Sequence, residues 1–141
     1  MLNGLKLALA LLVGLVCGSV VNMGIVTLGP MLIPPPAGAD MTTVEGIAAA
    51  MPLLEPKHFL SPFLAHALGT LVGACVAALI ATTRRSAVAY AVGALFLAGG
   101  IAASTMIPAP TWFIALDLLA AYIPMAWIGL RVADALKPRA S

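Results

Sequence analysis

Four long apolar segments follow one another along the chain, and each is long enough to cross a bilayer as a helix. About 20 apolar residues are needed to span the hydrocarbon core. Proline and capping residues separate the segments: Ser61 and Pro62 favour a helix start, Pro108 and Pro110 favour a stop, and Thr111 favours a new start. The pattern predicts an all-α polytopic membrane protein, a bundle of four transmembrane helices that forms a single domain over residues 1–141. The expected helices cover about residues 5–28, 62–83, 87–107 and 111–131.

The one long connection, residues 29–60, carries a second pattern. Its three consecutive prolines, 34–36, favour an extended backbone that cannot continue the first helix. Thr42 and Glu45 have the spacing of a capping box, with the threonine as the expected N-cap. The residues behind it place an apolar stripe on one helical face, and Pro52 is expected to end the helix. We therefore predict a short amphipathic helix over about residues 43–51, lying at the membrane surface. The stripe consists of Val44, Ile47, Ala48 and Met51.

The composition agrees with a membrane location. The chain is 62% apolar and 9% charged, whereas a soluble domain has about 25% charged residues. Its two cysteines, Cys17 and Cys75, lie inside apolar runs and do not form the framework of a disulfide-stabilised secreted protein. The first apolar run is also longer than the core of a signal peptide, so we expect it to be a retained helix.

The basic residues predict the orientation, because lysine and arginine collect in cytoplasmic loops. Six of the seven fall on one side of the predicted bundle, and only Lys57 falls on the other, close to three acidic residues. This distribution predicts a multi-pass protein of the bacterial inner membrane with both termini in the cytoplasm and residues 29–60 outside. The six are Lys6, Arg84, Arg85, Arg131, Lys137 and Arg139.

Small residues recur at a spacing of four on two of the helices. Gly14 and Gly18 form one such pair, and Gly69 and Gly73 form another. Pairs of this kind let helix backbones approach closely in lipid. We expect them to pack inside the bundle, while self-association or binding of a partner membrane protein through the same faces is the alternative. The expected surroundings are the lipid bilayer, and no basic and aromatic patch indicates nucleic acid.

Polar residues inside the apolar segments are the candidates for function, because they are unfavourable in a membrane. Asp117, His66 and Asn22, with Ser104 and Thr105, all fall in the outer half of the predicted bundle. An isolated carboxylate there is costly, so Asp117 is expected to be paired or protonated. His66 is the obvious partner. The sequence leaves two interpretations open: a ligand-binding or proton-titrating site, or a hydrogen bond that sets helix register.

A metal site has weaker support. Glu55 and His58 have the Glu-x-x-His spacing of di-iron bundles, but Pro56 opposes a helix there and the chain has no second copy. A mononuclear site that adds His66 and Asp40 is conceivable for zinc or iron. We expect no metal and no cofactor, and we expect these loop charges to be solvated. No catalytic triad and no phosphate-binding loop can be nominated.

Two stretches resemble known proteins. Residues 29–36, GPMLIPPP, and residues 55–74, EPKHFLSPFLAHALGTLVGA, resemble small four-helix bacterial inner-membrane proteins of unassigned function. The resemblance covers about the first half of the chain. It implies the fold and the location, and it implies no activity or catalytic residue.

Three functions are compatible with these patterns. We expect a non-enzymatic membrane protein that binds or moves a small molecule, lipid or proton at the outer polar site. The first alternative is an accessory or assembly subunit of a membrane complex. The second is a membrane-embedded, metal-assisted enzyme.

Overall fold

The computed structural model describes residues 2–137, and within that range the chain is helical and contains no strand. The expectation of an all-α protein is therefore confirmed. In chain order the elements are α1 (Leu2–Leu32), α2 (Val44–Ala50), η1 (Met51–Leu53), η2 (Pro56–Phe59), α3 (Leu60–Ile80), α4 (Arg85–Met106), α5 (Thr111–Ala120) and α6 (Ile123–Leu136), where η marks a 3-10 helix.

Four stretches of the described chain are long and apolar enough to cross a membrane, as the hydropathy pattern predicts. They are Asn3–Leu32, Pro56–Ile80, Arg85–Met106 and Thr111–Leu136. The second stretch begins earlier than expected, because η2 runs directly into α3. Phe59, which has no capping side chain, is the N-cap of α3, so the expectation that Ser61 has this role is wrong.

The fourth expected helix, over residues 111–131, is interrupted in the structure. The fourth stretch consists of α5 and α6, which are separated at Ala121 and Tyr122. Pro124, in the first turn of α6, is the physical reason. Proline has no backbone N–H, and its ring clashes with the carbonyl four residues earlier, here that of Ala120. The start of this stretch differs as well, because the N-cap of α5 is Pro110 and not Thr111.

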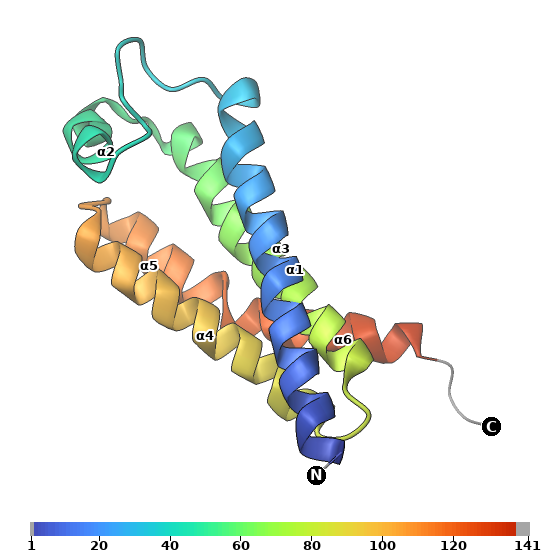
Figure 1. Ribbon diagram of the computed structural model, residues 1–141. Coiled ribbons are helices and arrows are strands. Elements are labelled where there is room, and N and C mark those ends of the chain that lie inside the picture. Colours follow the sequence, from blue (N-terminus) through green and yellow to red (C-terminus); the bar gives the residue numbers. More distant parts are fainter. Residues whose placement is uncertain (1, 138–141) are drawn as a thin grey trace.

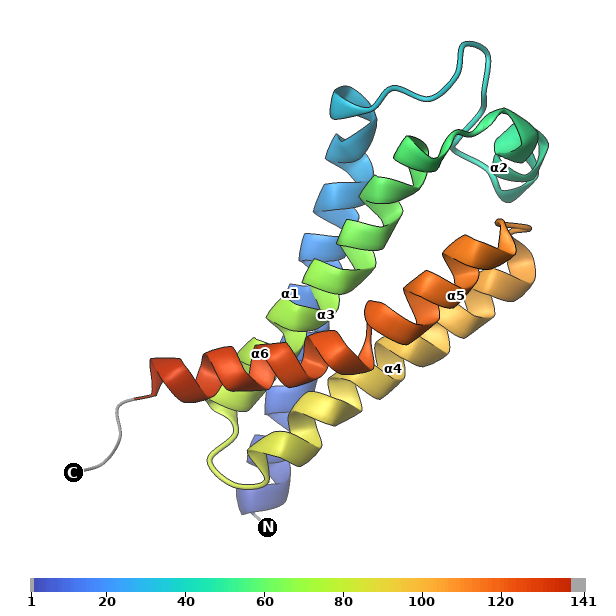
Figure 2. The same cartoon turned by 180° about the vertical axis from the view of Figure 1, so that it is seen from behind.

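The helices form two pairs that diverge toward one end of the molecule (Figures 1 and 2). α1 and α3 lie side by side, and α4 and α5 form an antiparallel pair. The short α2 lies at the open end, near the connection between α4 and α5. The start of α1 and the connection between α3 and α4 lie at the opposite end. From the break, α6 turns away from α4 and crosses α3.

Glycine makes the close contact between α1 and α3 possible. A Cβ atom added to Gly14 would lie 2.6 Å from the carbonyl oxygen of Gly73, and one added to Gly18 would lie 2.6 Å from that of Gly69. Real Cβ atoms do not come this close, so the two helices cannot keep their separation with larger residues at these positions. The two glycine pairs thus face each other within one chain, which is the close packing expected of small residues.

A polar cluster stabilises the end of the bundle that lies opposite α2. The guanidinium of Arg85 pairs with the carboxylate of Asp134 at 2.6 Å, and its Nε donates to the carbonyl of Ala78 at 2.8 Å. Lys137 donates to the carbonyl of Ala81 at 3.3 Å. These bonds connect the end of α3, the start of α4 and the end of α6, and they satisfy carbonyls that a helix end leaves free.

The short helix predicted in the long connection is present as α2, but its N-cap is Thr43, not Thr42. The hydroxyl of Thr43 accepts the backbone N–H of Gly46 at 3.0 Å. Thr42 instead donates its hydroxyl and its amide to Asp40, and Thr43 adds a third bond to that carboxylate. These hydrogen bonds lower the pKa of Asp40. Pro52 does not end the helical path, because η1 continues it to Leu53.

Candidate functional site

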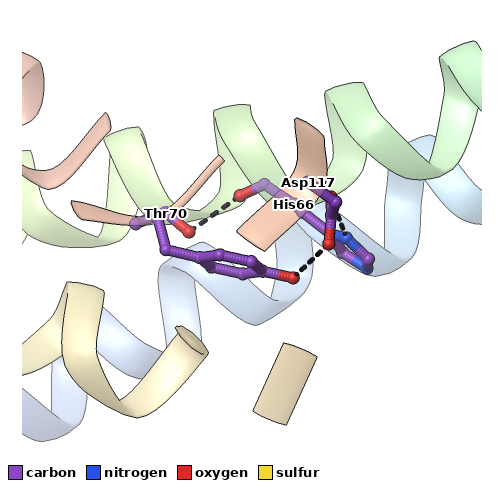
Figure 3. Close-up of polar contacts among 4 residues, drawn as sticks. His66, Thr70 and Asp117 are labelled. Carbon is purple, nitrogen blue, oxygen red and sulfur yellow. Dashed lines mark hydrogen bonds and ion pairs between the residues drawn. The ribbon is translucent and has the colours of Figure 1, made fainter. Parts of the chain in front are cut away.

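The two residues singled out as a pair in the sequence lie in direct contact. Nδ1 of His66, on α3, is 2.8 Å from Oδ1 of Asp117, on α5 (Figure 3). The carboxylate side chain is 7% exposed and the imidazole 25%. Residues 51 positions apart in the chain therefore form a partly buried hydrogen bond between two helices. The expectation that Asp117 has His66 as its partner is confirmed geometrically.

Tyr122 completes the environment of the carboxylate, and sequence reasoning missed it. Its hydroxyl donates to Oδ2 of Asp117 at 2.8 Å, and its ring stacks on that of His66 with the centroids 5.7 Å apart. The side chain is 1% exposed. In a continuous helix, residues five apart point about 140° away from each other, so no helical pattern joins Tyr122 to Asp117. The break between α5 and α6 brings them together.

Each carboxylate oxygen of Asp117 therefore accepts a hydrogen bond from a different part of the chain.

Thr70, which is fully buried, donates its hydroxyl to the backbone carbonyl of His66 at 2.8 Å, one turn below the imidazole (Figure 3). Since Asp117 as a carboxylate only accepts hydrogen bonds, the network assigns the proton on His66 to Nδ1. The other ring nitrogen, Nε2, makes no hydrogen bond within residues 2–137.

His66 and Asp117 lie on the wall of a cavity of about 320 Å³. The cavity occupies the space between the two diverging helix pairs, and its wall comes from α1, α3, α4, α5 and the long connection. The lining is mostly apolar, with a few polar side chains. A cavity of this size and character is typical of a small-molecule site. Its polar side chains are His58, Ser61, His66, Ser104 and Asp117.

The connection between α1 and α3 forms part of the wall of this cavity. Ile47 of α2 and Met51 of η1, both from the predicted apolar stripe, belong to the cavity wall. Phe59 packs against Phe113, with the ring centroids 4.8 Å apart, and against Trp112 at 5.4 Å. These aromatic contacts fix the start of α3 against the start of α5. At least part of the amphipathic face of α2 therefore covers the cavity.

Asn22, the third candidate, is not part of the His66–Asp117 network. It lies on α1 against Gly69 of α3, where a Cβ added to the glycine would be 3.0 Å from that of Asn22. Ser104 lines the cavity and donates its hydroxyl to Ile101 in its own helix, and Thr105 does the same to Ala102. Of the polar residues predicted at one depth, the structure brings His66, Asp117 and Ser104 to one cavity.

Glu55 and His58, the weak metal candidates, are neighbours in a capping box at the start of η2. Nδ1 of His58 accepts the backbone N–H of Glu55 at 2.8 Å, and the carboxylate of Glu55 pairs with Lys57 at 3.1 Å. In the part of the chain that the structure describes, no group of three or more His, Cys, Asp or Glu side chains is placed to hold a metal ion. The Glu-x-x-His spacing has a local capping role here.

The chain was compared with known proteins in three ways. It matches no protein family model, no curated protein and no solved structure.

Tyr122→Phe tests the network without changing its shape. The variant removes the donor to Oδ2 of Asp117, and an unsatisfied buried acceptor costs about 1–3 kcal/mol. We expect the midpoint of thermal unfolding in detergent to fall for Tyr122→Phe. The matched control is Tyr90→Phe, at an exposed position on α4, which should leave the midpoint unchanged. Equal midpoints for the two variants would contradict a role of Tyr122 in satisfying Asp117.

Proposed function

We propose that this chain is a multi-pass protein of the bacterial inner membrane that binds a small apolar molecule or lipid in the cavity between its helix pairs. The observation that carries the proposal is the position of the His66–Asp117 pair. The pair belongs to a mostly apolar cavity wall, and it is held by Tyr122 from the break between α5 and α6. A few precisely placed polar groups in a mostly apolar cavity are the arrangement that orients a ligand.

The distribution of charge supports the membrane orientation. Arg84, the last residue of the connection between α3 and α4, and Arg85, the first residue of α4, lie at one end of the bundle. The start of α1, which contains Lys6, lies at the same end. Lys57 belongs to the opposite end, where it pairs with Glu55. Arg139 lies outside the described residues. The spatial separation favours cytoplasmic termini and an outer position for the cavity and α2.

The two alternatives have less structural support. The accessory-subunit interpretation relied on glycine faces that contact a partner, but Gly14 and Gly18 contact Gly73 and Gly69 of the same chain. A partner would have to use another surface. The metal-assisted enzyme relied on Glu55 and His58, which form the capping box of η2. Binding in the cavity is the function that uses His66 and Asp117 together.

The orientation is tested by topology mapping in cells. Reporter fusions after residue 84 and at the C-terminus should have cytoplasmic activity, and a tag inserted near Ala39 should be accessible from outside. The physical reason is the retention of basic loops in the cytoplasm. Opposite readings at residue 84 and at the C-terminus would show that the stretch between them crosses the membrane an odd number of times, which contradicts the proposed topology.

Binding is tested by what copurifies with the protein in mild detergent. Mass spectrometry of the extract should identify a small molecule or lipid in a fixed ratio to the wild-type chain. Ala103→Trp places a large ring in the cavity, because Ala103 is part of its wall, and should remove that molecule. The matched control is Ala102→Trp, whose exposed position is not part of the wall and which should retain it. A copurifying molecule that is bound equally by both variants would place binding outside the cavity.

A further inference from the structure

The chemistry of the cavity wall restricts the ligand further than its size does. Two features matter: which atom of the His66–Asp117 pair has no hydrogen-bond partner, and which charged side chains line the cavity. Both concern His66 and Asp117, so the inference below rests on the proposed function and specifies the class of ligand.

Nε2 of His66 is the ring nitrogen of the His66–Asp117 pair that is left without a hydrogen-bond partner within residues 2–137. Nδ1 is occupied by Asp117, whose second oxygen is occupied by Tyr122. Nε2 makes no hydrogen bond within residues 2–137, and it is not sealed off either, because the one enclosed side-chain nitrogen or oxygen without a partner in that range belongs to Arg85. His66 lies on the cavity wall with its side chain one-quarter exposed. A ligand in the cavity can therefore reach Nε2.

The charges on the wall disfavour an anion. Within residues 2–137 no lysine or arginine belongs to the lining, and Lys57, which precedes the lining residue His58 in the sequence, is exposed and paired with Glu55. The wall does contain the carboxylate of Asp117. An anionic head group in this apolar space would be buried without a counter-ion and would be repelled by Asp117. Arginine, which normally pairs with carboxylates and phosphates, is absent from the described part of the wall.

We propose that the cavity selects neutral apolar molecules that carry a hydroxyl group, with the hydroxyl bonded to Nε2 of His66. A hydroxyl suits this position because it can donate to the neutral imidazole that Asp117 orients through Nδ1. The rest of the molecule contacts apolar side chains such as Ile47, Phe113 and Leu118. Free fatty acids and phospholipid phosphates are excluded by the same chemistry.

Three probes of equal apolar length test the selection: 4-pentylphenol, pentylbenzene and 4-pentylbenzoate. The protein is placed in nanodiscs of defined phospholipid, and each affinity is expressed against the probe's mole fraction in the bilayer. Binding is followed by NMR of the methionine methyl groups. Met41 and Met51 line the cavity and report occupancy, and the exposed Met31 is the reference. The Ala103→Trp variant defines which signal changes belong to the cavity.

We expect the phenol to bind about threefold to tenfold more tightly than pentylbenzene, the effect of one net hydrogen bond of about 0.5–1.5 kcal/mol. The benzoate should bind at least tenfold more weakly than the phenol. In His66→Phe the preference of phenol over pentylbenzene should disappear. If that variant does not fold, the order of affinities for the wild-type protein still decides the question.

Two different failures are distinguishable. If pentylbenzene or the benzoate binds as tightly as the phenol in the cavity, the ligand class is wrong and the proposed binding function stands. If none of the probes changes the Met41 and Met51 signals in a way that Ala103→Trp abolishes, both the ligand class and the binding function are contradicted.

Discussion

A carboxylate buried among apolar helices must have hydrogen-bond donors, and the arrangement of this protein depends on how Asp117 obtains them. An unsatisfied charge in such surroundings is unfavourable by several kcal/mol. Here α3 supplies the imidazole of His66 and the break before α6 supplies the hydroxyl of Tyr122. The network therefore connects α3, α5 and the break between α5 and α6. It joins the two helix pairs at the wall of the cavity.

The helices pack closely through small residues at the end of the bundle opposite α2. α1 and α3 meet through glycines, and the buried cluster next to them is rich in alanine from α3, α4 and α6. Small side chains bring backbones together and leave little space between helices. Toward α2 the lining changes to larger side chains, among them Ile47, Phe59 and Phe113, and the helices separate around the cavity. Compact packing at one end and a cavity at the other follow from where the small residues occur.

The helical fold and part of the candidate site could be predicted from the sequence, because they depend on strong local patterns. Hydropathy identified the four long apolar stretches, and the cost of burying a charge pointed to a contact between His66 and Asp117. Three features depended on tertiary geometry and could not be read in this way. Tyr122 reaches Asp117 only because the helix breaks. Thr43 rather than Thr42 is the N-cap, and the hydroxyls of both threonines donate to Asp40. Asn22, at a similar predicted depth, lies in the α1–α3 contact.

The most direct measurement of the central interaction is ring-nitrogen NMR of isotope-labelled histidine in the membrane-embedded protein. The chain has only two histidines, so removing the His58 signal with His58→Gln assigns the other. For His66 we predict a protonated Nδ1 in a strong hydrogen bond and an unprotonated Nε2, and we predict that Asp117→Leu abolishes this pattern. A ring that carries its proton on Nε2, or that averages between both tautomers like a solvated histidine, would contradict the network on which the site depends.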